Sequence, residues 1–192
     1  MPDNITQIPP PRVAIWDTVT SYVTRSWYRF FYNIYAILGS GSLRSGAFYD
    51  TTDQVATVIN TPQSITFNST RLAQGVSLGA VTSRIYVDRT GTYNFQLSLN
   101  VGNYSAALGY IRFGIAINNV LQTDTGSLCD VPAGRYVIVA PQNYVLRLSE
   151  GDYVEFLWNT DNLSVKLACL PLVSYAPRIP SANMAVFCNI GE

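Results

Sequence analysis

Residues 91–101 read GTYNFQLSLNV, and their strict alternation is the feature that most limits what this chain can fold into. Apolar side chains occupy every second position from Tyr93 to Val101, and amide or hydroxyl side chains fill the positions between them. Successive side chains of a strand point to opposite faces of a sheet, so this pattern predicts a strand with one buried face. A helix would mix both kinds of side chain on every face.

Similar short segments, separated by turn residues, run through residues 46–192. Asn118 and Asn119 interrupt one of them, and Asn tolerates the positive φ that a two-residue hairpin turn needs. Glu150 and Gly151 mark a second turn between strands. Many short strands without a helix predict an all-β domain, an antiparallel β-sandwich of the jelly-roll type with about 8–10 strands. The segments expected to be strands are 83–88, 91–101, 110–117, 120–123, 144–149, 152–160, 163–170 and 182–190.

Residues 1–45 are different in kind and form a predicted N-terminal attachment arm, which is expected to be extended before its helix. The proline triplet 9–11 favours an extended backbone. Residues 24–38 place apolar side chains three or four positions apart, the spacing of one helix face, and predict a short amphipathic helix. Thr24 or Ser26 is its candidate N-cap and Gly39 its candidate end, followed by the Gly-Ser joint 39–42.

The composition excludes several kinds of chemistry. The formal net charge is 0, which gives no basic face for nucleic acid. There is no His, the commonest general base and metal ligand, and the 3 Cys lack a CxxC spacing. The acids near 50–53 and 150–155 are expected to be solvated turn residues. We therefore expect no enzyme activity, no catalytic residues, no cofactor and no metal site.

No targeting segment is expected, because residues 1–24 lack an apolar core of the kind that signal peptides have. The longest apolar stretch is interrupted by Arg29 and Asn33 and is too short to span a bilayer, so membrane insertion is not expected.

Two strands resemble those of the tumour-necrosis-factor and complement globular-head superfamily. The first has the G-x-Y-x-F pattern from Gly91 to Phe95, and the second has the L-x-L-x-x-G-D-x-V pattern from Leu146 to Val154. The resemblance implies a jelly roll that assembles as a homotrimer. On β-strand 110–117, the outward Tyr110 and Arg112 are the candidate trimer contacts.

A second resemblance is to jelly-roll proteins of tailed-bacteriophage virions. Their G-x-F-Y-D-T-T-x-Q start is matched from Gly46 to Gln54, and the later Asn60, Pro62 and Asn68 match as well. The arm is similar to a phage segment in which P-P-R-x-x-x-x-D precedes T-R-x-W-Y-x-F-F; that segment has a Thr-Gly-Leu-like turn where this chain has Thr-Ser-Tyr at 20–22. Together the two resemblances cover residues 9–100 and 144–158.

These resemblances imply a virion structural protein assembled in the bacterial host cytoplasm, with the major capsid protein or other virion proteins as partners. Within that class, a capsid decoration (cement) protein is favoured, because no long fibre shaft is present. A tail or head fibre whose knob binds a host receptor is the first alternative. A secreted trimeric ligand is the second. A host surface glycan is a further expected ligand of the knob, with Tyr104 and Tyr136 as candidate contacts.

The aromatic arm is the expected docking element, because an isolated helix of this length needs a surface to pack on. The open alternative is that the helix folds back on its own sandwich. The candidate docking residues are Trp16, Tyr22, Trp27, Phe30, Phe31, Ile34 and Tyr35.

Overall fold

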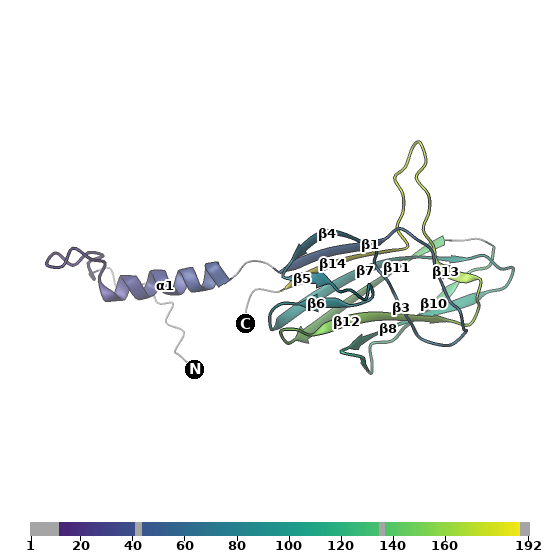
Figure 1. Cartoon of the computed structure of the whole chain (residues 1–192), viewed down its shortest axis with the longest axis horizontal. Coiled ribbons are helices and arrows are strands. Elements are labelled where there is room, and N and C mark those ends of the chain that lie inside the picture. Colours follow the sequence, from purple (N-terminus) through teal and green to yellow (C-terminus); the bar gives the residue numbers. More distant parts are fainter. Residues whose placement is uncertain (1–11, 41–43, 135–136, 189–192) are drawn as a thin grey trace. The chain divides into compact units, whose positions relative to one another are not determined.

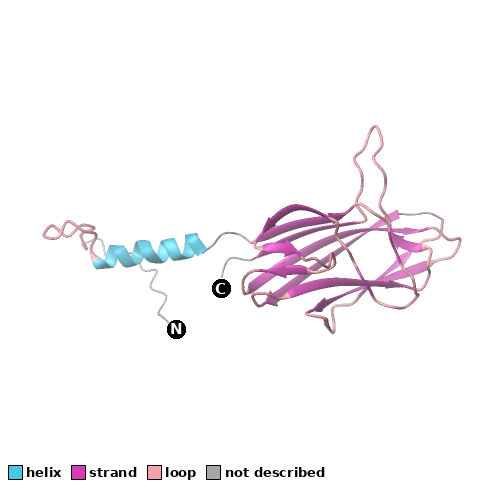
Figure 2. Cartoon of the chain, in the orientation of Figure 1, coloured by secondary structure: helices cyan, strands magenta, loops and turns pink. Residues whose placement is uncertain are grey.

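The computed structural model describes residues 12–40, 44–134 and 137–188, with side chains omitted for 35–40. The chain divides into two compact units, residues 1–42 and residues 43–192. The first unit carries α1 (Arg25–Ser40), and the second carries all the strands (Figures 1 and 2). The helix therefore continues through Gly39, which does not end it as the sequence analysis expected.

The second unit is a sandwich of two antiparallel sheets (Figure 2). The first, called the β7 sheet, has β7 at its centre: β11 lines one edge of β7, while β14 and β13 share the other. Its strands are β1 (Ser45–Asp50), β2 (Gln54–Val55), β4 (Ser69–Gln74), β7 (Gly91–Asn103), β11 (Val137–Leu148), β13 (Val165–Leu167) and β14 (Ala182–Cys188).

The second sheet, called the β12 sheet, runs in the order β10-β8-β12-β6-β5, with β9 beside β8 and β3 beside β12. Its strands are β3 (Gln63–Ser64), β5 (Val76–Leu78), β6 (Ile85–Val87), β8 (Gly109–Ile117), β9 (Val120–Leu121), β10 (Ser127–Val131) and β12 (Tyr153–Thr160).

The chain passes from one sheet to the other at almost every step between its main strands. The strands β1, β7, β11 and β14 lie in one sheet, while β6, β8, β10 and β12 lie in the other. This alternation is the jelly-roll arrangement, so the fold class predicted from the sequence is confirmed. The asparagine turn is also confirmed, because Asn118 and Asn119 adopt φ values of 50° and 65°.

The core lies between the two sheets and is built from the alternating apolar residues. Phe95 of β7 and Phe156 of β12 meet across it with ring centroids 5.6 Å apart. Trp158 is nearly fully buried, and Ile111, Phe113 and Ile115 of β8 point into the core as their alternation predicts. No disulfide joins the cysteines at 129, 169 and 188 to one another.

The acidic motif after β1 connects the two sheets. Asp50 is buried, and its carboxylate accepts hydrogen bonds from the Thr52 backbone N–H (2.8 Å), Thr66 Oγ1 (3.1 Å) and Asn68 Nδ2 (3.2 Å). The Gln54 side chain bonds both backbone groups of Thr66. The phage-like D-T-T-x-Q sequence thus holds the loop that follows β3, and Asp50 is not the solvated turn acid that we expected.

Candidate functional site

The arm begins with a small hairpin, residues 15–24. Trp16 and Val23 form an antiparallel bridge. The Asp17 N–H donates to the Tyr22 carbonyl at 2.9 Å, and the Thr24 N–H donates to the Ile15 carbonyl at 2.8 Å. The described part of the arm before the helix is therefore folded back on itself, and the expectation of an extended segment is wrong for these residues. The proline triplet 9–11 lies outside the described residues.

Asp17 and Ser21 explain why this turn forms. The Asp17 carboxylate accepts hydrogen bonds from the N–H groups of Val19 (2.8 Å) and Thr20 (3.2 Å). These backbone hydrogen bonds hold the pKa of Asp17 below its usual value. Ser21 adopts a φ of 57°, the left-handed region that glycine occupies most easily. In the sequence resemblance, Ser21 stands where the phage segment has glycine.

The hairpin is fixed to the first turn of α1. The Trp27 indole Nε1–H donates to the Val13 carbonyl at 2.9 Å. The Thr24 hydroxyl donates to the Ala14 carbonyl at 2.8 Å, so it is not used as the side-chain N-cap that we expected. The backbone carbonyl of Thr24 accepts from the Tyr28 N–H, which starts the helical ladder. Hairpin and helix therefore form one small prefolded unit.

Three of the six described candidate docking side chains remain open to solvent in this unit. Trp16 is 60% exposed, Tyr22 75% and Phe31 48%. Trp27, Phe30 and Ile34 are half-buried, and Trp27 packs edge-on against Phe30 with ring centroids 5.7 Å apart. The side chain of the seventh candidate, Tyr35, lies outside the described residues.

Two further exposed aromatics were not among our candidates. Tyr28 and Tyr32 are more than half exposed, and their rings stack with centroids 6.3 Å apart. Their spacing of one helical turn is a signal that the sequence already carried. Exposed aromatic side chains on this scale mark an interaction surface, since a monomeric protein rarely leaves them uncovered.

The two candidate trimer contacts lie side by side on the outward face of β8. The Tyr110 hydroxyl donates to Asn60 Oδ1 at 2.7 Å, and the Arg112 guanidinium lies over the Tyr110 ring at 4.9 Å from its centroid. Arg112 also lines a hollow of about 490 Å³ together with Leu121, Leu128 and Leu157. Both residues are thus outside the core, and their role in chain–chain contact stays a prediction.

The remaining acids serve the architecture of the sandwich. Glu155 is buried, accepts from the Ser83 hydroxyl at 2.7 Å and lies 3.6 Å from Arg84, so it too is not a solvated acid. Asp152 accepts from the Ser149 N–H and from the Asn118 side chain in the turn before β12. Within the described ranges no three His, Cys, Asp or Glu side chains gather as metal ligands.

Of the candidate glycan contacts, Tyr104 is partly exposed, and Lys166 Nζ lies 4.4 Å from the centroid of its ring. Tyr136 lies outside the described residues. Within the part of the chain that the structure describes, no helix has the length and apolarity needed to cross a membrane.

Comparison with solved structures finds 231 similar chains, one of which is described here. No family model matches the chain, and no curated protein matches it. The globular domain of the zebrafish complement 1qA protein resembles it with a TM-score of 0.46 and 14% sequence identity, over 76% of this chain and 96% of that one. A likeness this weak carries no argument about function, and the jelly-roll assignment above depends on the strand pairing.

Proposed function

We propose that this chain is a structural protein of a bacteriophage virion, a trimeric capsid decoration protein that docks through its N-terminal arm and displays the sandwich as a knob. The observation that carries the proposal is the prefolded hairpin–helix unit with its uncovered aromatic side chains. The sequence resemblance of the arm and of residues 45–79 to phage virion proteins supplies the kind of particle.

The arm has the chemistry of a docking element. Burying a large apolar side chain stabilises a complex by about 1.5–3 kcal/mol relative to leaving it exposed. Association itself costs an estimated 4–15 kcal/mol or more, so the partly exposed Trp16, Tyr22 and Phe31 of one arm give weak binding at best. Three arms joined in one trimer would bind far more tightly, because the second and third contacts become intramolecular. This argument, with the superfamily resemblance, supports a homotrimer.

The partner is expected to be the major capsid protein or another virion protein. The hairpin is already formed, so less conformational entropy is lost on docking than an unstructured arm would lose. Trp16 and Tyr22 project from it as anchors of the type that dominates protein interfaces. In this proposal the protein is located in the virion, after assembly in the host cytoplasm.

The deciding measurement is the number of copies of this chain in purified particles relative to the major capsid protein. Hundreds of copies in a simple ratio to the shell support the decoration role. A few to a few dozen copies would contradict it and support a fibre or tail component. Absence of the chain from particles would contradict both virion roles. The secreted-ligand alternative would then remain, and the jelly-roll fold that it requires is present.

Light scattering tests the trimer separately, on the purified full chain. A mass of three chains is expected. Replacing Arg112 by Glu should lower that mass if β8 forms the contact, whereas an unchanged trimer would move the contact to another face.

A further inference from the structure

The segment between β13 and β14 leaves the sandwich as a long projecting loop, residues 170–180, here called the finger (Figure 1). Its base is closed by paired backbone hydrogen bonds between Leu170 and Ile179, at 2.9 and 3.1 Å. Its tip is closed by a second pair between Val173 and Ala176, at 3.1 and 3.3 Å. The finger is therefore an ordered hairpin that can form one wall of a site.

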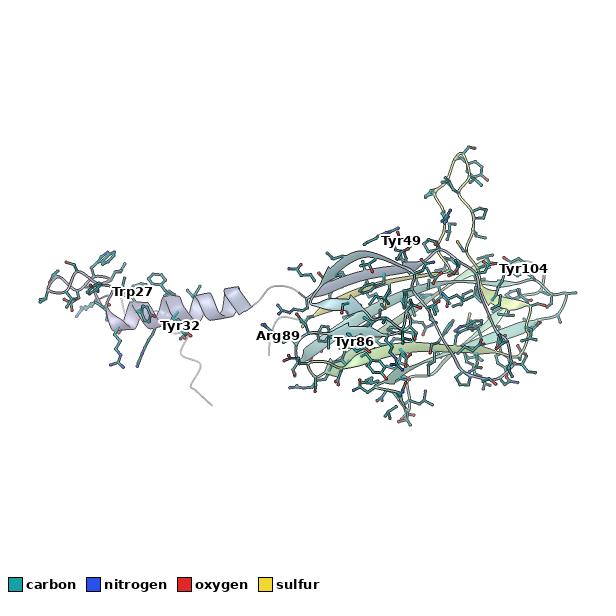
Figure 3. The ribbon with its side chains drawn as sticks, viewed as in Figure 1. Trp27, Tyr32, Tyr49, Tyr86, Arg89 and Tyr104 are labelled. Carbon is teal, nitrogen blue, oxygen red and sulfur yellow. The ribbon has the colours of Figure 1, made fainter. Side chains whose placement is uncertain are left out.

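A cavity of about 330 Å³ lies between the finger and the outward face of β1 and β4. Tyr49 and Thr51, at and just after the end of β1, form one side of it, and Arg71 of β4 lies beside them. Figure 3 shows Tyr49 near the base of the finger. The finger contributes Leu172, Pro177, Arg178 and Pro180 to the opposite wall. This volume is in the lower part of the range for ligand sites, which suits a single sugar ring or a group of similar size.

Two arginine side chains, those of Arg71 and Arg178, line this cavity. The Arg71 guanidinium lies over the Tyr49 ring at 4.6 Å from its centroid, an arrangement that holds the group flat. A stacked guanidinium keeps its N–H groups in its own plane, where a planar carboxylate can accept two of them. Among the described residues, neither Arg71 nor Arg178 forms an ion pair. Both are therefore available to an anion.

The surroundings supply less negative charge than the two guanidinium groups supply positive charge. Asp50 is the single acid in the strands β1, β4, β7, β11 and β14, and it is buried and hydrogen-bonded on the inner side. Asp53, near the base of the finger, is occupied by Lys166 and by the backbone N–H of Cys169. The cavity therefore has a positive potential that favours an anionic ligand.

A second hollow, of about 710 Å³, lies over the outward face of the β7 sheet. It adjoins the cavity, because Arg71 lines both. Its polar side chains are uncharged apart from Arg71. Amides and hydroxyls of this kind donate to and accept from sugar hydroxyl groups, whereas they offer nothing specific to a second charge. The neutral polar groups are Gln96, Ser98, Asn143 and Asn183.

We propose that this surface binds an acidic saccharide. The carboxylate of a uronic acid unit binds at Arg71 and Arg178, and the neighbouring sugar units lie across the amide-lined hollow. The inference concerns the knob alone and holds whether the chain decorates a capsid or belongs to a fibre.

Binding of the purified full chain to polygalacturonate, with neutral galactan as the reference polymer, tests this site. Binding to the acidic polymer and not to galactan is expected. Free galacturonate should compete, while galactose, which lacks only the carboxylate, should not. R71Q and R178Q should each weaken binding by about tenfold or more, since each removes a charge-assisted hydrogen-bonding group. R178K should recover part of the loss, because it keeps the charge without the planar fork.

R29Q is the matched control, since it removes the same charge from the helix in the other unit of the chain. It should bind as the unaltered chain does. Loss of binding in R29Q equal to that in R178Q would show non-specific charge attraction and overturn the proposal. Stronger competition by galactose 6-sulfate than by galacturonate would overturn the carboxylate assignment. No binding by the unaltered chain, including the case in which a second copy covers this face, would overturn the site itself. None of these results depends on the copy number in particles.

Discussion

The indole Nε1–H of Trp27 donates a hydrogen bond to the backbone carbonyl of Val13, 2.9 Å away and across the entry to the helix. This bond and the Thr24–Ile15 backbone bond tie the hairpin to α1. Trp27, one of the seven candidate docking residues, therefore helps to organise the arm, and the more exposed Trp16 and Tyr22 are the outward candidate anchors.

Trp27→Ala should release the hairpin from the helix and lower incorporation of the chain into particles, while the sandwich stays folded. The sandwich reports its own state through Trp158, which is buried in its core. We expect an unchanged Trp158 fluorescence melt and faster hydrogen exchange at the Thr24 amide. Trp27→Phe is the partial control, because it keeps the ring and removes only the N–H donor. Full incorporation of Trp27→Ala would contradict a docking role for the arm.

Ser21→Gly should stabilise the hairpin by up to about 1 kcal/mol, since a left-handed backbone is unfavourable for residues with a Cβ and not for glycine. Ser21→Val should destabilise the hairpin, because a branched Cβ makes the left-handed backbone conformation still less favourable. Hydrogen exchange of the Asp17 amide, which bonds the Tyr22 carbonyl, measures both changes. Equal exchange rates in the two variants would show that Ser21 does not limit the turn.

Asp50→Asn should destabilise the sandwich by about 1–3 kcal/mol, because an amide group would face donors that now bond a carboxylate. The donors involved are the N–H of Thr52, the hydroxyl of Thr66 and the side-chain amide of Asn68. Urea unfolding measures the change. Asp130→Asn, at an exposed acid of β10, is the control and should shift the midpoint little.

Phe95→Ala should destabilise the sandwich by about 3–5 kcal/mol, the usual loss when a buried aromatic side chain is truncated. Phe95 is fully buried and contacts Phe156 of the opposite sheet. Val145→Ala, on the exposed face of β11, should change stability by less than about 0.5 kcal/mol. A normal melt for Phe95→Ala would show that the two sheets do not depend on this contact.

Tyr93 should make the sandwich sensitive to alkali. Burial, with a smaller contribution from Cys188, raises the pKa of Tyr93 to about 12, and its hydroxyl donates to the Arg89 carbonyl at 2.8 Å. The unfolded chain has an ordinary tyrosine that ionises near 10, so above that pH the unfolded state loses its proton first. The contribution of Tyr93 to stability is complete below pH 10 and falls between about pH 10 and 12. Tyr93→Phe should flatten that part of the pH profile, measured by urea unfolding at each pH.

Several long strands could be predicted from sequence because each contains several repeats of the two-residue period, but β11 was expected only from residue 144 and begins at Val137. β7 was expected over 91–101 and spans Gly91–Asn103. Strands of two or three residues, such as β2, β3 and β9, are too short to show any period. Residues 171–181 lie between two predicted strands and received no prediction, and the finger forms through a few backbone hydrogen bonds that no local pattern reveals.

The candidate site, too, could be predicted only where the sequence has a repeating pattern. The aromatic face of the helix was visible in the spacing of its residues, whereas the hairpin before it depends on the side chain of Asp17 and an unusual φ at Ser21. Asp50 looked like a surface acid, because two of the side chains that bond it, Thr66 and Asn68, are distant in sequence. Arg71 and Arg178 are brought together only by the fold, so nothing in their sequence context marked them as a pair.

The pairing of β1 with β14 determines when the β7 sheet can be completed during synthesis. The first strand of the sandwich is bonded along its length to the last, from Ser45 opposite Phe187 to Asp50 opposite Ala182. During synthesis β1 leaves the ribosome long before β14 exists, and one of its edges waits without its strand partner until residue 187 has emerged. Pairings this distant in sequence make folding slow. The knob is therefore completed only after residue 187 has been made, and every ribosome carries an unfinished sheet until then.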